Sequence, residues 1–252
     1  MEIQRKKEGH QGPTLDQVKR TYGFWGRYPR FYAFLCRLVS LGGKTEESLR
    51  RRAVEHLASV QEGKILEIAC GTGRDLLYVE QIVGPCMTLF ALDYTPEMLE
   101  VAQQSAVEHK WENLHFIQGD AAALPFRDGV FAGVLCVFGM SAIPGYPACL
   151  REALRVTKIG GRLVVCDGRL FHGGWRWVNP LITFLLRRTT CWAYERDIVN
   201  DLRKLDPDLI VKEWNAGTLF LAELRPGTAH SASDTEISFP IKTRSNNYAG
   251  NR

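Results

Sequence analysis

Residues 65–75 combine an apolar run, a carboxylate and two closely spaced glycines, a pattern that could hold a nucleotide-type cofactor. Glu67 lies near the end of the apolar run, and Gly71 and Gly73 form the turn that follows it. Glycines let the backbone approach a ligand where a Cβ atom would collide. A helix that begins behind such a turn offers unpaired N–H groups to a polar or anionic group. The alternative interpretation is an ordinary β–α turn without a ligand.

Two further carboxylates end later apolar runs. Asp93 closes residues 87–93, and Asp120 closes residues 116–120 ahead of a Leu-Pro-Phe turn. A carboxylate at position 93 suits bidentate hydrogen bonding to the ribose hydroxyls of a nucleotide cofactor. Asp93 could also be a plain helix cap, because the Thr-Pro pair behind it favours a helix start. Capping and binding are both compatible with this spacing.

The glycine spacing differs from that of dinucleotide-binding proteins. Their fingerprint, Gly-x-Gly-x-x-Gly, would place a third glycine where this chain has Leu76. A NAD-dependent oxidoreductase remains an alternative, but Leu76 and the Gly119-Asp120 pair count against it.

Together, the glycine loop with Glu67, the carboxylate Asp93 and the Gly119-Asp120 pair resemble the motifs of the class I S-adenosylmethionine (SAM) methyltransferases. The likeness is greatest to the broad small-molecule and lipid-modifying group that includes the ubiquinone and menaquinone biosynthesis enzymes. It covers about residues 45–225. The resemblance implies an α/β fold with a Rossmann-like, seven-stranded, mostly parallel sheet, helices on both faces and a C-terminal reversed β-hairpin.

The resemblance also implies which residues would hold the methionine part of SAM. Gly71 and Gly73 would pass beneath it, and Glu67 would organise the loop and the amino group of the cofactor. The neighbouring positions that the resemblance assigns to the cofactor are Ala69, Thr72 and Val137.

The adenosine part would be held by residues that follow the next two strands. Asp93 would bind the ribose hydroxyls, with Tyr94 and Met98 flanking the adenine. Asp120 would accept a hydrogen bond from the adenine amino group, and Ala121 would donate a backbone N–H.

The elements that must position these residues alternate along the chain. Strands are expected near residues 64–69, 87–92, 114–118, 131–137 and 161–167, with helices between them. Such alternation predicts a parallel sheet covered on both faces. Two closing strands near residues 209–214 and 218–224 fit the reversed hairpin.

A single domain is expected over residues 15–225. Residues 1–14 are predicted to be a flexible N-terminus, and residues 226–252, rich in Ser, Thr, Gly and Asn, a disordered tail. Two parts added to the core should determine the acceptor: an N-terminal lid at residues 15–43 and an acceptor-side insertion at residues 168–197.

Aromatic residues are frequent in both added parts. Rings of the lid, such as Tyr22 and Trp25, could contribute about 1–2 kcal/mol of cation–π attraction to a sulfonium, or could simply pack on the core. In the insertion, an apolar helix flanked by tryptophans and by Arg187 and Arg188 could sit at a lipid surface. A lid helix packed on the sheet edge is the alternative.

The expected chemistry is a one-step displacement, in which an O, N or C atom of the acceptor attacks the SAM methyl carbon. The sulfonium is a good leaving group, so the protein chiefly aligns the reactants and excludes water. A base is needed only if the acceptor carries a proton. The candidate bases or orienting groups are His172, Tyr28, Tyr146 and Tyr194, and no spacing singles out any of them. His172 could equally be a polar lid residue.

The function expected from the resemblance is methylation of a small, lipophilic or aromatic acceptor of quinone-like or phenolic type. Methylation of a phospholipid headgroup amine at a membrane surface and a non-catalytic SAM-binding partner subunit remain alternatives. The net charge of +4 is mild, and the Asp/Asn-Pro-Pro-Tyr/Phe tetrad of amine-methylating nucleic-acid enzymes is absent, so no nucleic-acid partner is expected.

The cysteine content of the chain indicates the cellular compartment in which the protein is expected. Seven scattered cysteines without a Cys-x-x-Cys pair argue against a disulfide framework and against a zinc site, and no metal is expected. Cys70 and Cys136 are interpreted as small apolar fillers. A reducing, cytoplasmic location is expected, with peripheral membrane contact as an open possibility. The sequence has no uninterrupted apolar run of about 18 residues and no secretory signal at its start.

Overall fold

The structure is a computed structural model that describes residues 12–39, 44–60, 62–84, 87–186 and 189–227. The predicted flexible N-terminus, residues 1–14, and the predicted disordered tail, residues 226–252, lie outside the described residues except for residues 12–14 and 226–227. Arg187 and Arg188 of the expected lipid-facing segment also lie outside them.

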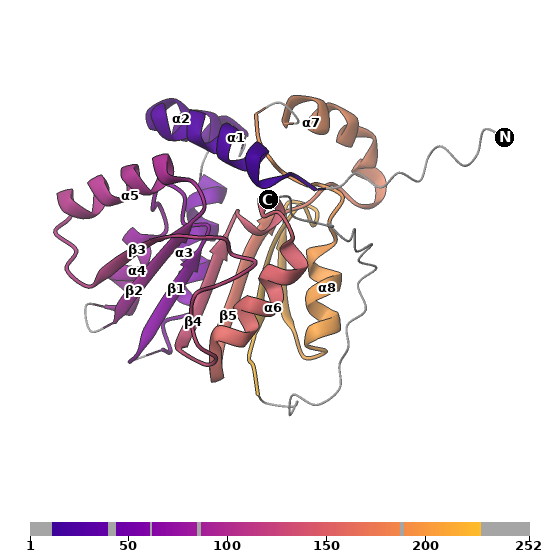
Figure 1. Cartoon of the computed structure of the whole chain (residues 1–252). Helices are drawn as coiled ribbons and strands as arrows, with labels where there is room; N and C mark the ends of the chain where they lie inside the picture. The colour runs from indigo at the N-terminus through magenta and orange to yellow at the C-terminus, as the bar shows by residue number, and fades with distance from the viewer. Residues whose placement is uncertain (1–11, 40–43, 61, 85–86, 187–188, 228–252) are drawn as a thin grey trace, which may run out of the picture.

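A seven-stranded sheet forms the centre of the molecule, with the strand order β3-β2-β1-β4-β5-β7-β6 (Figure 1). The strands are β1 (Lys64–Ile68), β2 (Thr88–Asp93), β3 (Leu114–Gln118), β4 (Phe131–Val137), β5 (Thr157–Gly168), β6 (Ile210–Trp214) and β7 (Leu219–Leu224). Strands β1 to β5 pair in parallel, and β7 runs antiparallel to both β5 and β6. The predicted mostly parallel sheet with a reversed C-terminal hairpin is therefore confirmed.

Helices cover both faces of this sheet. One face carries α3 (Lys44–Glu55), α4 (Leu76–Val83) and α5 (Pro96–Glu108), and the other carries α6 (Tyr146–Val156) and α8 (Ile198–Leu205). In β1, Ile65 packs in the same cluster as Leu49 of α3, whereas Leu66 packs in the same cluster as Leu150 of α6. Because both faces of the central strands are buried, these strands are continuous apolar runs.

Strand β5 begins at Thr157, four residues earlier than the sequence predicted. Thr157 already pairs with Phe131 of β4, and a bulge separates this pair from the regular ladder further along. A Cβ atom at Gly161 would lie 2.8 Å from the carbonyl oxygens of Ala132 and Lys158. Gly161 therefore lies inside the strand, at a bulge that only a residue without a side chain can form.

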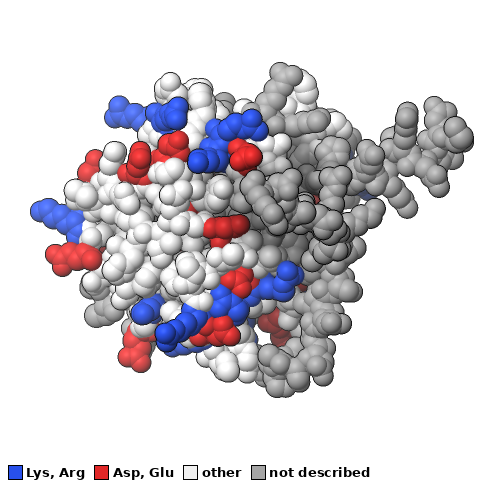
Figure 2. Space-filling view, in the orientation of Figure 1, with Lys and Arg blue, Asp and Glu red and all other residues white. Residues whose placement is uncertain are grey.

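Two N-terminal helices and a segment after β5 lie over the carboxyl ends of the parallel strands (Figure 1). They are α1 (Leu15–Arg27), α2 (Pro29–Val39), the 3-10 helix η3 (Gly173–Val178) and α7 (Asn179–Leu186). Thr14 caps α1 in a capping box with Gln17. Trp25 of α1 is buried, and its indole N–H donates to the carbonyl of Thr189 at 2.8 Å, which joins α1 to the segment after α7. In the same orientation, Figure 2 shows basic side chains at the upper edge of the molecule, over α1 and α2.

Candidate functional site

A pocket of about 90 Å³ lies between the carboxyl ends of β1, β2 and β4 and the covering helices α1 and α2. In a sheet of this topology, the strand order reverses between β1 and β4, and ligands commonly bind at such a switch point. Of the residues that the sequence assigned to a cofactor, seven line this pocket: Ala69, Gly71, Asp93, Tyr94, Met98, Asp120 and Ala121. Four do not line it: Glu67, Thr72, Gly73 and Val137.

The loop after β1 turns sharply at Ala69 and Gly71, which have φ angles of 56° and 55°. This left-handed conformation is unfavourable for alanine and easy for glycine. A Cβ atom at Gly71 would meet nothing within 4 Å, so the backbone here faces open space at the pocket. At Gly73 a Cβ atom would lie 3.1 Å from the Cβ atom of Ala102 in α5. The second glycine therefore serves the packing of the loop, and only the first is exposed to a ligand.

Asp93 ties the end of β2 to this loop. One carboxylate oxygen accepts the N–H of Gly71 at 2.8 Å, and the other accepts the N–H of Thr95 at 2.8 Å. Burial raises the pKa of Asp93, and the backbone N–H donors oppose that rise. Helix α5 has Thr95 at its N-cap, so Asp93 is not the capping residue itself. A carboxylate can accept about four hydrogen bonds, which leaves capacity on the side that faces the pocket.

Asp120 lies opposite, after β3. It is half-buried, lines the pocket and accepts the N–H of Ala122 at 2.9 Å. The N–H of Gly119 donates to the carbonyl of Asp93 at 3.0 Å. The two carboxylates that the sequence singled out are thus held at the same pocket by adjacent strand ends.

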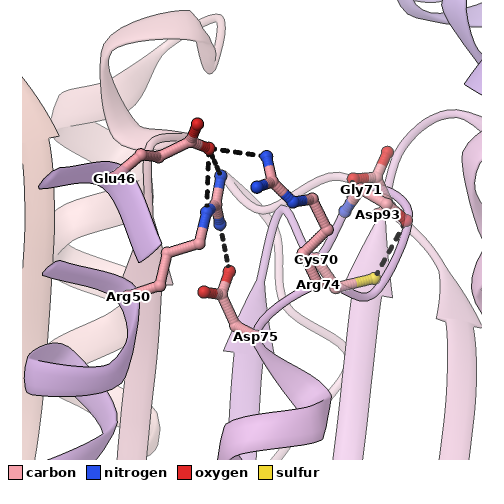
Figure 3. A network of polar contacts seen from close by, with 7 residues as sticks. All are labelled: Glu46, Arg50, Cys70, Gly71, Arg74, Asp75 and Asp93. Carbon is pink, nitrogen blue, oxygen red and sulfur yellow. Dashed lines mark hydrogen bonds and ion pairs between the residues drawn. The ribbon is translucent and has the colours of Figure 1, made fainter. Parts of the chain in front are cut away.

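A buried charge network lies beneath the glycine loop (Figure 3). Arg50 of α3 donates to Glu46 at 2.9 and 3.0 Å and to Asp75 at 2.5 Å. Arg74 of the loop donates to the same Glu46 oxygen at 2.6 Å. The guanidinium carbon of Arg50 also lies 5.0 Å from the ring centre of Phe138, which lines the pocket. Helix α3 and the loop are therefore held together by opposite charges that are almost excluded from water.

Glu67 belongs to the same buried layer. It is 2% exposed, and its Oε2 atom accepts no hydrogen bond from any residue that the structure describes. Burial and the charge of Asp75 raise the pKa of Glu67 well above its usual range, and Arg50 opposes that rise. Asp75 is a hydrogen-bond partner of Glu67, and with its pKa raised Glu67 can carry the proton of this buried carboxyl pair.

The four candidate bases are not brought together. Tyr28 and His172 are exposed, and Tyr194 is half-buried with its ring 6.1 Å from that of Trp192. The hydroxyl of Tyr146 donates to Asp201, and burial together with this carboxylate raises the tyrosine pKa. None of the four lines the pocket.

Two other tyrosines, which the sequence reasoning did not propose as bases, do line the pocket. They are Tyr22 of α1 and Tyr32 of α2. Burial raises the pKa of Tyr22, so its hydroxyl stays protonated at neutral pH. The helical period could have separated these residues from Tyr28, because Tyr22 and the buried Trp25 are three positions apart and share a face of α1, whereas Tyr28 lies beyond that helix's end.

Neither a thiol nucleophile nor a metal centre emerges from the described residues. Cys70 and Cys136 are buried, and burial raises the pKa of each thiol well above its usual range, so both remain protonated at neutral pH. Among the described residues, no group of three or more His, Cys, Asp or Glu side chains is placed to hold a metal ion.

Comparison with known proteins shows that the strand-end residues of this site lie in a part of the chain that a protein-family model matches. The family model of the ubiE/COQ5 methyltransferases matches residues 30–169, which is more than half of the chain. The demethylmenaquinone methyltransferase of Lactococcus lactis is 35% identical over 124 residues, covering 49% of this chain and 49% of that protein. The demethylmenaquinone methyltransferase of Thermus thermophilus is 38% identical over 136 residues, covering 54% and 60%. The chain thus spans about half the length of the first of these relatives.

Among solved structures, the YcgJ protein of Bacillus subtilis matches with a TM-score of 0.53 and 23% identity, covering 65% of this chain and 70% of that one. A likeness at this identity shows the fold alone.

Proposed function

Because the chain belongs to the ubiE/COQ5 methyltransferase family, we propose that it transfers the methyl group of SAM to a small, quinone-like or phenolic acceptor. One observation carries this proposal: Gly71, Asp93 and Asp120 meet at a single pocket inside the residues that the family model matches.

The residues around the pocket fit the parts of SAM. The open space at Gly71 leaves room for the methionine part. Glu67 is buried and does not line the pocket, so its proposed role toward the amino group of SAM receives less support. The remaining lone pairs of Asp93 suit the ribose hydroxyls, and Asp120 would accept from the adenine amino group. When bound, SAM would supply a methyl group activated by its sulfonium.

The chain itself would contribute alignment and exclusion of water. The helices α1 and α2 cover the pocket with apolar and aromatic side chains, of which Val18, Tyr22 and Tyr32 line it directly. Positioning two reactants in this way can supply most of the acceleration that such a displacement needs. The proposed bases His172, Tyr28, Tyr146 and Tyr194 receive less support, because none of them lines the pocket.

The activities for which the curated relatives are named favour a quinone-like acceptor over the other acceptors. Both curated relatives described above are demethylmenaquinone methyltransferases. We therefore place N-methylation of a lipid headgroup and SAM binding without catalysis behind quinone methylation. The free state of the five described cysteines fits the proposed reducing, cytoplasmic location.

Incubation of the full chain with deuterated-methyl SAM and demethylmenaquinone tests this proposal. The expected result is a quinone product heavier by one trideuterated methyl group, and none from a parallel reaction with phosphatidylethanolamine. Calorimetry should detect binding of SAM and none of NADH. Labelled phosphatidylethanolamine without labelled quinone would favour the lipid-amine alternative, and SAM binding without any labelled product would favour the non-catalytic one.

A further inference from the structure

The covering helices α1 and α2 present an unusual row of aromatic side chains to solvent. Phe24 is 51% exposed, Phe31 is 55% exposed and Phe34 is 59% exposed, with Tyr28 between them. The rings of Phe31 and Phe34 stack at 6.4 Å, and those of Phe24 and Tyr28 lie 5.1 Å apart. These four residues form one half of an exposed surface, the aromatic face.

The other half comes from η3 and α7. Trp175, Trp177, Leu181 and Phe184 are all exposed there, Trp177 by 75% and Phe184 by 71%. The two indole rings stack on one another at 6.4 Å. Large apolar side chains at this density are unusual on a surface that faces only water.

Both halves lie at the same end of the molecule, over the carboxyl ends of the strands and above the pocket (Figure 1). The hydrogen bond from Trp25 to Thr189 joins them, because it links α1 to the segment directly after α7. Part of the aromatic face is therefore the outer surface of the two helices, α1 and α2, that line the pocket on their inner side.

The same segments carry an excess of positive charge. Residues 15–39 contain five Lys or Arg residues and one acidic residue, and residues 171–190 contain three arginines and no acidic residue. The whole chain carries only +4, so the rest of it is net acidic. Figure 2 shows basic side chains over α1 and α2. Among the described residues, the same segments that expose the aromatic side chains also expose Lys19, Arg20, Arg27, Arg30 and Arg176.

We propose that the aromatic face docks on the surface of an anionic lipid bilayer. Aromatic rings prefer the headgroup region of a bilayer, where their apolar bodies leave water and their polar edges stay hydrated. Lysines and arginines beside them are attracted to anionic headgroups. A second copy of this chain is a poorer occupant, because a two-fold interface would bring two positive faces together. The docking goes beyond the proposed function. Its purpose would be delivery of a lipophilic acceptor, and that purpose rests on the proposed function.

Flotation of the full chain with lipid vesicles tests the docking. The chain should float with vesicles that contain phosphatidylglycerol, float much less with pure phosphatidylcholine, and be released by high salt. The variant Phe31→Ser/Phe34→Ser/Trp177→Ser should bind anionic vesicles about tenfold more weakly or worse, since it removes apolar area from the contact. The control Val107→Ser/Ile159→Ser removes side chains that are 78% and 83% exposed on other parts of the surface, and should bind like the unmodified chain.

A charge-reversal pair isolates the electrostatic part. Arg30→Glu/Arg176→Glu should weaken binding to anionic vesicles, whereas Arg127→Glu/Arg203→Glu, on exposed sites elsewhere, should weaken it less. The proposal is overturned if the unmodified chain does not float with anionic vesicles, if it floats equally with neutral ones, or if the serine variant floats like its control. It is also overturned if light scattering shows a dimer that the serine variant dissociates, without vesicle binding.

The docking and the proposed function can fail separately. SAM affinity, measured by calorimetry, should be unchanged in the serine variant, because none of its three sites lines the pocket. Vesicle binding without SAM binding or methyl transfer would refute the proposed function and support the docking. Methyl transfer to a detergent-dispersed quinone without vesicle binding would support the proposed function and refute the docking.

Discussion

Replacing Asp93 by alanine should weaken the fold and the cofactor site together, because one carboxylate serves both. Its oxygens accept the N–H groups of Gly71 and Thr95, each at 2.8 Å. A buried donor left without a partner costs about 1–3 kcal/mol. The bond to Thr95 is buried, and the half-buried Gly71 can be partly rehydrated. We therefore expect the free energy of unfolding to fall by roughly 2–4 kcal/mol.

The proposed binding role adds a second, separable effect. Loss of charge-assisted hydrogen bonds to the ribose should weaken SAM binding by about 1.5–3 kcal/mol, which is roughly 10- to 150-fold in Kd. Urea unfolding without SAM measures the first effect, and calorimetry with SAM measures the second. Asp93→Asn retains one carbonyl acceptor and should lie between alanine and the unmodified chain in both assays.

Glu100→Ala is the matched control, since it removes an exposed carboxylate from α5 and should leave both quantities within error. An unchanged free energy of unfolding in Asp93→Ala would refute the reasoning about the two amide donors. Reduced stability with unchanged SAM affinity would instead mean that the ribose assignment is wrong.

Three further changes test other parts of the structure. Arg50→Met should lower the free energy of unfolding by about 3–5 kcal/mol, because it leaves Asp75 buried and unpaired; urea unfolding should show partial recovery in Arg50→Met/Asp75→Asn. Burial raises the pKa of Asp167 to about 6, above its ordinary value, so the folded chain takes up a proton more readily than the unfolded chain. The stability of the unmodified chain relative to Asp167→Asn should therefore increase as the pH falls from 7 to 4, by up to roughly 3 kcal/mol, and a pH-independent difference in urea unfolding would contradict this. Gly26→Ala would place a Cβ atom 2.8 Å from the backbone of α5 and should cost roughly 1–3 kcal/mol in thermal unfolding, whereas Gly174→Ala, where a Cβ atom meets nothing within 4 Å, should be nearly neutral.

Most of the sheet could be predicted from the sequence because its signals are local. The runs that became β1 to β4 are apolar and of strand length, and their observed ends lie within a residue of the predicted ones. The helix expected between the third and fourth strands is wrong, because residues 119–130 form turns. The start of β5 was missed because it depends on a bulge. Pairing of Thr157 with Phe131 brings together segments that sequence periodicity does not connect.

The cofactor residues were predictable to the extent that they follow strand ends. Adjacent parallel strands bring their carboxyl ends to one edge of the sheet, so Gly71, Asp93 and Asp120 had to lie near one another. Their roles toward SAM stay predictions. Which tyrosine faces the pocket depends instead on how α1 and α2 rotate on the core, and the sequence reasoning chose Tyr28 over Tyr22.

The network around Arg50 could not be predicted from spacing alone. Its partner Asp75 lies 25 positions further along the chain, and the two meet only because α3 packs beside α4. The one available signal was the pairing of Glu46 with Arg50 one helical turn later, which on most helices is a solvent-exposed ion pair. Burial converts that ordinary pair into the support of the glycine loop.

The position of β7 has a consequence for the order in which this molecule can assemble. During synthesis β6 leaves the ribosome before β7, yet β6 pairs with β7 and not with β5. The edge of β5 therefore stays unpaired until β7 has been synthesised and Leu224 pairs with Leu163. Joining such distant segments is entropically slow, and an unpaired strand edge invites association with other chains. The final hairpin should thus be the last step of folding and the stage at which a nascent chain is most prone to aggregate.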